Sequence, residues 1–105
     1  MLVTSTPSIE GNQIEEYLGI VMGSTVRARH IGTDILATLK NVVGGELKSY
    51  SILLAQARKE AMERMVVSAE EMGADAVVNF RYETSTIAAA ASEVIAYGTA
   101  VKFEN

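Results

Sequence analysis

One stretch decides the fold: residues 49–73 read SYSILLAQARKEAMERMVVSAEEMG. It contains no proline, and its only glycine is the last residue. The residue types that dominate it (Ala, Leu, Met, Glu, Gln, Lys and Arg) lose the least free energy on entering a helix. Ser49 suits the N-cap, and Gly73 suits the left-handed residue that follows a helix. The stretch therefore predicts one long helix from Ser49 to Met72, about 36 Å in length.

The apolar residues of this helix fall on two adjacent arcs. The first arc holds Tyr50, Leu54, Ala57, Ala61, Met65 and Met72, and the second holds Ala55, Met62, Val66 and Ala69. Together they are wider than the stripe of about 100° that one sheet covers. The width predicts either a second packing surface, on another subunit, or a helix that lies deeper in its own core. Two solvated ion pairs are expected one turn apart, Lys59 with Glu63 and Glu60 with Arg64.

Composition limits the class of protein. A chain of 105 residues is predicted to be one domain, 1–105, and 49% hydrophobic residues are too many for a disordered chain. The net charge of −4 argues against binding to nucleic acid or to an anionic membrane surface. The chain has no cysteine, which excludes disulfides and thiolate chemistry. With no apolar run of membrane-spanning length and no basic-then-apolar start, the predicted location is the cytoplasm.

The residues before the long helix predict two strands. Leu2 to Ser5 is a short strand that Pro7 ends. A long strand from Gln13 to Arg29 has one mostly apolar face, which is expected to lie under the helix. That face comprises Ile14, Glu16, Leu18, Ile20, Met22, Ser24 and Val26. Gly19 and Gly23 fall on the other face, where they predict a bulge, a bend or the close approach of another backbone.

A shorter helix is predicted between the long strand and the long helix. It runs from His30 to Val43, and Thr33 or Asp34 would cap it. Gly44-Gly45 is expected to end it by C-capping, in preference to cradling an anion.

The residues after Gly73 predict two more strands. One runs from Ala74-Asp75 to about Ser85, and the other from Ser92 to Phe103, with a flexible hairpin connection over Thr86–Ala91. The expected fold is a two-layer α+β domain, a mainly antiparallel sheet under one long helix, plus the short helix. The far face of the sheet would then carry small apolar side chains that nothing covers. Covering them by association gives a second reason to expect a homo-oligomer. Its members would be Val21, Val77, Val94, Ala96 and Ala100.

Over essentially its whole length the chain resembles the YbjQ-like family of small bacterial and archaeal proteins. The residues that carry the resemblance are Gly44-Gly45-Glu46, Tyr50, Leu54, Ala57-Arg58, Ala61, Met65, Met72-Gly73-Ala74-Asp75-Ala76-Val77 and Tyr97-Gly98-Thr99-Ala100-Val101. The resemblance implies a dodecin-subunit-like fold with a strand-helix-strand-strand core, and a ring-shaped homo-oligomer, a pentamer. It also brings the label of heavy-metal binding, but no activity and no catalytic residues.

Metal ligands are scarce in this sequence. Soft metals prefer thiolate or imidazole, and the chain has one histidine and no cysteine. His30 and Asp34 would share one face of a helix that began at His30, and in a ring they would recur in every subunit. The alternative is a partly exposed histidine near a helix start. Met22, Met62, Met65 and Met72 have the chemistry to bind Cu(I), although methionine at helical spacing usually fills a core.

Other chemistry is equally sparse. Arg27 and Arg29 flank His30 and form the only local positive cluster, which would bind a small anion if repeated around a ring, or would simply end a strand. No nucleophile motif is present.

Three hypotheses for the function follow from these observations. The leading one is a structural or binding module, a homo-oligomeric ring that holds a small ligand or ion between subunits. The others are a metal-binding protein with its site between subunits, and an enzyme with an intersubunit site. The sequence does not identify a cofactor.

Overall fold

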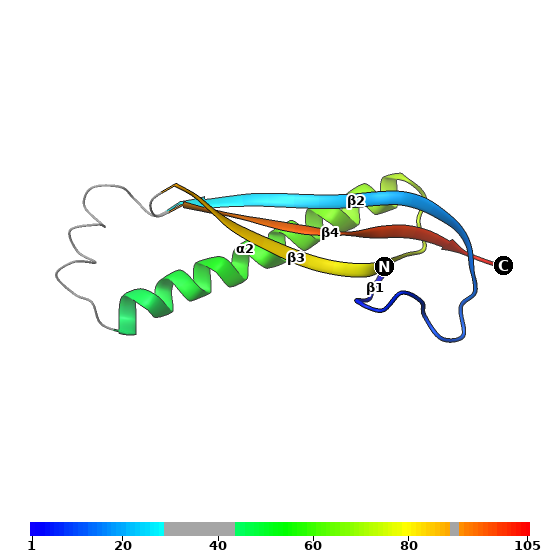
Figure 1. Ribbon diagram of the computed structural model, residues 1–105, viewed down its shortest axis with the longest axis horizontal. Coiled ribbons are helices and arrows are strands. Elements are labelled where there is room, and N and C mark those ends of the chain that lie inside the picture. Colours follow the sequence, from blue (N-terminus) through cyan, green and yellow to red (C-terminus); the bar gives the residue numbers. More distant parts are fainter. Residues whose placement is uncertain (29–43, 89–90) are drawn as a thin grey trace.

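The computed structural model describes residues 1–28, 44–88 and 91–105. In this part of the chain one long helix covers one face of a four-stranded sheet (Figure 1). The elements are β1 (Leu2–Val3), β2 (Ile14–Ala28), α2 (Gly44–Glu71), β3 (Ala76–Ala88) and β4 (Ala91–Phe103). The strand order is β1-β3-β4-β2, in which only the β1–β3 pair is parallel. The sequence therefore predicted the α+β class and the mainly antiparallel sheet correctly.

The C-terminal end of α2 forms as the sequence predicted. Gly73 has a φ of 77°, which is the left-handed region that favours glycine. The amide of Gly73 donates to the carbonyl of Glu70 at 3.0 Å, and the amide of Ala74 donates to the carbonyl of Ala69 at 3.1 Å. These two hydrogen bonds form a Schellman motif, which satisfies carbonyls that the end of a helix leaves without partners.

The start of α2 differs from the prediction. In the described residues the helix begins at Gly44, so Gly44-Gly45 and Ser49 lie inside it, and Ser49 is not its N-cap. A glycine disfavours a helix by about 1 kcal/mol relative to alanine without forbidding it, and a helix already formed downstream extends more easily than a new one nucleates. The short helix predicted over residues 30–43 lies outside the described residues.

The strands are longer than predicted at the hairpin. β3 continues to Ala88 and β4 begins at Ala91, so most of the predicted flexible connection over Thr86–Ala91 is paired strand. β-branched Thr84, Thr86 and Ile87 favour this extension.

The helix covers the face of the sheet that was expected to be free. Val21, Thr25, Val94 and Ala96 are buried, whereas Ile20, Met22 and Val26 on the other face are 73%, 57% and 51% exposed. The prediction for β2, and that for the far face, therefore have the two faces reversed. Both faces are apolar, but their side chains differ in size. The face under α2 carries glycines and alanines, which let the helix approach closely.

The core lies between this face and one stripe of α2. Its fully buried members on the helix are Ala57, Ala61, Met65 and Ala69. Met62 and Val66 are half-buried against the same core, while Met72 is 41% exposed. The second apolar arc of the helix thus largely belongs to the core of its own subunit, which was the alternative to a separate packing surface. A hydrogen bond of 2.7 Å between the hydroxyls of Tyr50 and Ser92 joins α2 to β4.

The N-terminal segment covers one end of the outer face, which we define as the face of the sheet away from α2. Backbone hydrogen bonds join Thr4 and Thr6 to β3 as far as Phe80. Ile9 packs there with Ile14 and Phe103 over a small second core of Ala76, Val78 and Val101. Asn79, with a φ of 54°, lies where the register between β3 and β4 shifts. Beyond Phe80 the contact described between the N-terminal segment and β3 is a side-chain one, from Nη1 of Arg81 to the carbonyl oxygen of Ser5 at 3.2 Å.

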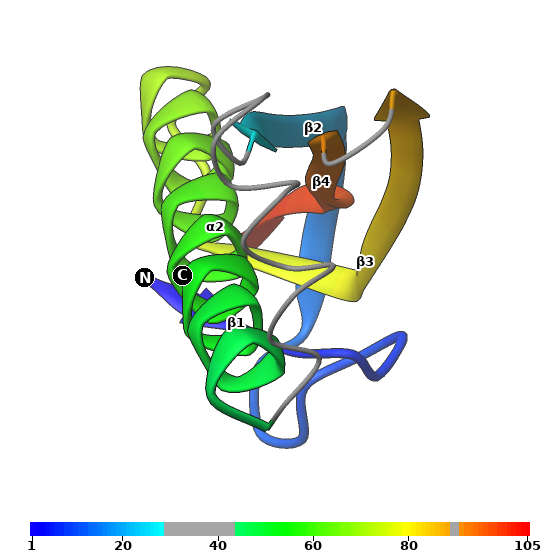
Figure 2. The same cartoon turned by 90° about the vertical axis from the view of Figure 1, so that its left-hand side faces the viewer.

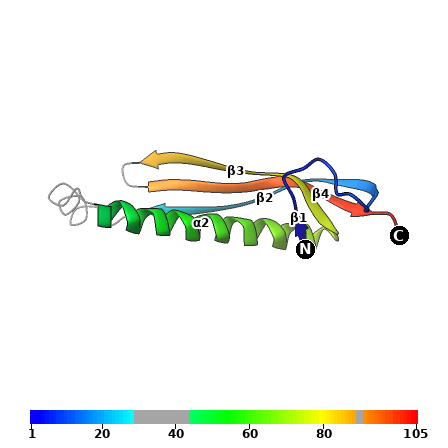
Figure 3. The same cartoon turned by 90° about the horizontal axis from the view of Figure 1, so that it is seen from below.

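The distal half of β3 pairs with β4 but lies away from α2. In Figures 2 and 3, α2 lies alongside β2 and β4, and β3 is the strand farthest from it. Residues 81–88 are all exposed, whereas residues 20–26 of β2 alternate between exposed and buried, and most of β4 alternates between half-buried and buried. Among residues 1–28, 44–88 and 91–105, this part of β3 is therefore exposed on both faces. We call it the β3 arm.

Candidate functional site

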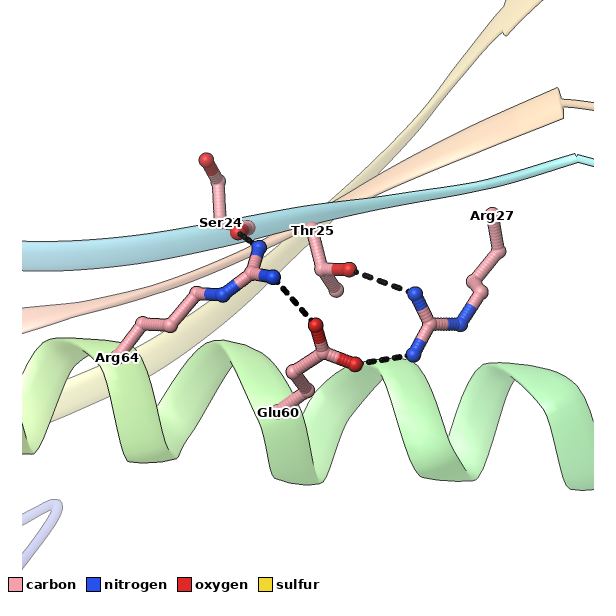
Figure 4. Close-up of polar contacts among 5 residues, drawn as sticks. All are labelled: Ser24, Thr25, Arg27, Glu60 and Arg64. Carbon is pink, nitrogen blue, oxygen red and sulfur yellow. Dashed lines mark hydrogen bonds and ion pairs between the residues drawn. The ribbon is translucent and has the colours of Figure 1, made fainter.

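Three charged side chains connect the edge strand to the helix (Figure 4). The carboxylate of Glu60 on α2 lies between two guanidinium groups, accepting from Arg27 through Oε2 and from Arg64 through Oε1. Arg27 comes from the end of β2, and Arg64 lies one helical turn after Glu60. We call this group the Glu60 clasp.

Each arginine of the Glu60 clasp has a second partner on β2. Arg27 donates from Nη1 to the hydroxyl of Thr25 at 3.0 Å, and Arg64 donates from Nη1 to the carbonyl oxygen of Ser24. Thr25 is buried under the helix, and alternation places Arg27 on the same side of the strand. The arrangement therefore fixes the end of β2 against the middle of α2.

Electrostatics favour the charged form of Glu60. The hydrogen bond from Arg27, with the positive charges of Arg27 and Arg64, holds the pKa of the Glu60 carboxyl below its ordinary value, against a smaller opposing effect of desolvation. Both carboxylate oxygens are engaged. Glu60 is thus a stable anion at neutral pH and is poorly suited to act as a general base.

A shallow depression of about 410 Å³ lies beside the Glu60 clasp. Its lining residues are Arg27, Gln56, Lys59, Glu60 and Glu63. Two cations and two carboxylates balance each other, so the lining does not select an anion. The geometry fits a structural connection better than it fits a binding site.

The structure brings few of the predicted site residues together. Arg27 is bound to Glu60, while Arg29, His30 and Asp34 lie outside the described residues, so the anion site and the His30–Asp34 pair stay predictions. In residues 1–28, 44–88 and 91–105, no three His, Asp or Glu side chains gather closely enough to hold a metal ion.

The methionines lie in different environments. Met65 is fully buried in the core, and Met22 is exposed on the opposite face of the sheet. Met65 therefore fills the core, as methionine at helical spacing usually does. The sheet separates it from Met22, so these two side chains do not share a Cu(I) site within one subunit.

The sequence predicted the Glu60–Arg64 ion pair, which forms at helical spacing. It did not predict the pairing of Arg27 with Glu60, because Arg27 was assigned to the face away from the helix. The signal was present in the alternation of Gly23, Thr25 and Arg27, which share one side of β2. With the correct face, Arg27 would point toward the polar flank of α2, where Glu60 lies.

Within the described ranges, no helix is both long and apolar enough to cross a membrane.

Comparison with known proteins gives a family over the whole chain. A family model described as "Putative heavy-metal-binding", that of the YbjQ proteins, matches residues 1–104. Similar proteins, each named "UPF0145 protein", occur in archaea and bacteria. The protein from Methanosarcina acetivorans is 52% identical over 105 residues, which is 100% of this chain and 99% of that protein. The protein from Thermotoga maritima is 49% identical over 104 residues, covering 99% and 98%.

A solved structure shows the same fold. A protein of unknown function from Pediococcus pentosaceus, which belongs to the DUF74 family, superposes with a TM-score of 0.69 over 99% of this chain and 98% of that one. The two sequences are 16% identical. The likeness therefore concerns the fold alone, and none of the names of these proteins states an enzymatic activity.

Proposed function

The chain belongs to the YbjQ family, and from this premise we propose that it is a homo-oligomeric structural or binding module that holds a small ligand or ion between its subunits. The observation that carries the proposal is the apolar part of the outer face that stays exposed in the described residues. Ile20, Met22 and Val26 are more than half exposed along β2. Cross-strand pairing places them on the same face as Ile95 and Tyr97 of β4. Association would remove this patch from water.

The shape of the subunit supports association. The Cα radius of gyration is 17.6 Å, whereas a compact domain of this length has a radius of about 13 Å. An elongated subunit buries less of its own surface, and a small domain has little stability to spare. Contacts between copies would bury the surface that the elongated subunit leaves exposed.

A closed ring is our preferred assembly, with five subunits as the resemblance implies. In a ring, each exposed side chain recurs once per subunit. Side chains that bind an ion weakly one at a time can therefore form a symmetric site together. This repetition gives a chain without cysteine a way to bind an ion or small molecule. We propose no catalytic role, since both oxygens of Glu60 are occupied by arginines.

Native mass spectrometry tests this function. The untagged protein is purified without chelator and sprayed from a volatile buffer, so that subunit number and any retained mass are read together. A pentamer with additional mass supports the module and identifies the class of ligand. A clean pentamer supports the assembly and contradicts retention of a tightly bound ligand. A monomer contradicts the proposal.

Metal binding is the second candidate, and the description of the family supports it. The proposed ligands are His30 and Asp34 of neighbouring subunits. Metal uptake of the intact oligomer, measured by elemental analysis after exposure to Zn²⁺ or Cu²⁺, is expected to fall in His30→Ala and Asp34→Asn. Glu104→Gln, near the end of the chain, serves as the matched control for removal of one carboxylate. Unchanged uptake in His30→Ala would contradict the assignment.

A further inference from the structure

We propose that a hollow at one end of the outer face, where the N-terminal segment meets the start of β2, binds a neutral pyranose sugar. The site is built within one subunit, so it goes beyond the proposed function, which places a ligand between subunits, and it does not depend on the oligomer. Three features carry the inference: a hollow that the fold holds open, a tyrosine that a β-bulge brings to it, and a lining that is polar but uncharged.

The hollow has a volume of about 490 Å³. Its lining comes from the segment 8–14 together with Tyr17 of β2. Small-molecule sites usually have volumes of about 300–1,000 Å³, so this one has room for a single sugar ring. The hollow opens to solvent, and a ligand can therefore enter it without a movement of the chain.

The backbone around the hollow is held in place. The amide of Asn12 donates to the carbonyl of Ile9 at 3.1 Å, which closes a four-residue turn. Gly11, the third residue of this turn, has a φ of 85°, the conformation for which a type II turn needs glycine. Ile9 and Ile14 pack against the small second core of the outer face. The hollow is therefore formed before a ligand arrives.

A β-bulge brings Tyr17 to the same face as Ile14. Residues three apart on a regular strand point to opposite faces. Ile14 nevertheless pairs with Phe103 and Tyr17 pairs with Val101, and these two partners, two apart on β4, share a face. The register shift directly after Ile14 supplies the extra residue, and a second shift follows directly after Tyr17. Bulges of this kind re-aim side chains next to functional sites, and Tyr17 is left 66% exposed.

The lining offers neutral hydrogen-bonding groups beside this aromatic ring. Ser8, Asn12 and Gln13 supply a hydroxyl and two carboxamides, and a carboxamide both donates and accepts. Within residues 1–28, 44–88 and 91–105, none of these three side chains has a hydrogen-bond partner. A pyranose presents hydroxyls along its edge and polarised C–H groups on its faces. The hydroxyls match the carboxamides, and a C–H face packs against the negative face of an aromatic ring.

Charge argues against other classes of ligand. No Asp, Glu, Lys, Arg or His side chain of the described residues lines the hollow. Residues 8–17 carry three glutamates, and the first basic side chain of the sequence is that of Arg27, so the surroundings repel a phosphate or a carboxylate. Organic cations are usually held by a cage of several aromatic rings, whereas Tyr17 is the one aromatic residue in this lining. A neutral ligand fits best.

Saturation-transfer difference NMR on the full-length protein tests the proposal, because it detects weak binding to an assembly of any size. The probes are four neutral pyranoses (D-glucose, D-galactose, D-mannose and N-acetyl-D-glucosamine), with choline as a cation and inorganic phosphate as an anion. We expect saturation of the C–H protons of at least one pyranose, with a Kd on the order of 1 mM for so small a ligand. No signal from any pyranose would overturn the proposal, and so would a signal from choline or phosphate alone.

Variants locate the site. Tyr17→Ala is expected to weaken binding of the sugar about tenfold, and Asn12→Ala is expected to weaken it severalfold. Both positions are exposed, so folding should be retained, and circular dichroism checks it. Tyr82→Ala, which removes another exposed tyrosine on the β3 arm, is the matched control and should bind as wild type does. Wild-type binding in Tyr17→Ala and Asn12→Ala, or an equal loss in Tyr82→Ala, would overturn the proposal.

Discussion

Gly23 of β2 lies directly beneath Ala61 of α2, so close that a Cβ atom on Gly23 would lie 2.3 Å from the carbonyl oxygen of Ala61. The same atom would lie 2.4 Å from the backbone nitrogen of Met65. Real Cβ atoms do not approach backbone atoms this closely. The helix therefore rests on the sheet at a distance that only glycine permits, and this contact fixes which face of the sheet α2 covers.

Gly23→Ala is expected to destabilise the protein strongly. Because backbone atoms of the helix cannot move aside as a side chain can, α2 must shift, and overpacking of this kind typically costs about 1–3 kcal/mol or more. Urea unfolding at fixed protein concentration measures the change. Ser24→Ala, at the exposed neighbouring residue, is the control and should change the free energy of unfolding by less than about 0.5 kcal/mol. Equal stability of Gly23→Ala and wild type would contradict the close packing.

Gly73→Ala tests backbone conformation rather than space. A Cβ at this position would meet only the Cε of Lys102, at 4.0 Å, so there is room for it. The φ of 77° is nevertheless unfavourable for alanine, and the expected loss is about 1–2 kcal/mol. Gly73→Asn should lose less, because asparagine tolerates the left-handed region. Thermal unfolding followed by circular dichroism measures both, and alanine as stable as glycine would contradict the Schellman motif.

Met65 and Met72 allow the same substitution to be compared at a buried and at an exposed position of α2 and the residue that follows it. Met65 is fully buried, whereas Met72 is 41% exposed. Met65→Ala removes a core side chain and leaves a cavity, with an expected loss of about 2–5 kcal/mol. Met72→Ala makes the same chemical change near the surface and should cost clearly less. Similar losses in urea unfolding would mean that the stripe of α2 that faces the sheet has been assigned incorrectly.

The Glu60 clasp predicts a pH dependence of stability. The pKa of Glu60 is lowered in the folded state by its hydrogen bond from Arg27 and by both arginine charges. The unfolded chain therefore binds the proton more readily, so the clasp contributes stability above the ordinary carboxyl pKa, and this contribution is lost as the pH falls through the folded pKa.

Glu60→Gln is expected to lower the Tm at neutral pH, and the difference from wild type should shrink in acid, well below the ordinary pKa of about 4.3. Glu63→Gln, also on α2 but exposed, is the control for loss of one charge. Differential scanning calorimetry across this pH range, at low and high salt, gives the result. A difference between Glu60→Gln and wild type that does not change with pH would contradict the role of the charged carboxyl.

Local patterns predicted most of the elements, because their causes are local. The alternation of residues predicted β2 and β4 to within two residues of their ends, and a single glycine predicted the end of α2. The predictions for the start of α2 and for the far end of β3 were wrong. Glycine and other small residues only weaken the preference for helix or strand, and neighbouring structure can restore it. The Arg27–Glu60 ion pair was missed because it joins residues 33 positions apart.

The sequence by itself determined the class, the strands and the length of the apolar stripe on α2, since these follow from periodicity and propensity within each segment. Only the tertiary structure decided which face of the sheet the helix covers. Hydrophobicity does not distinguish the two faces: Val21 lies on one and Ile20 on the other. Close packing does, because Gly23 and Ala96 let α2 approach the sheet, whereas the bulkier Ile20, Met22 and Ile95 would hold a helix farther away.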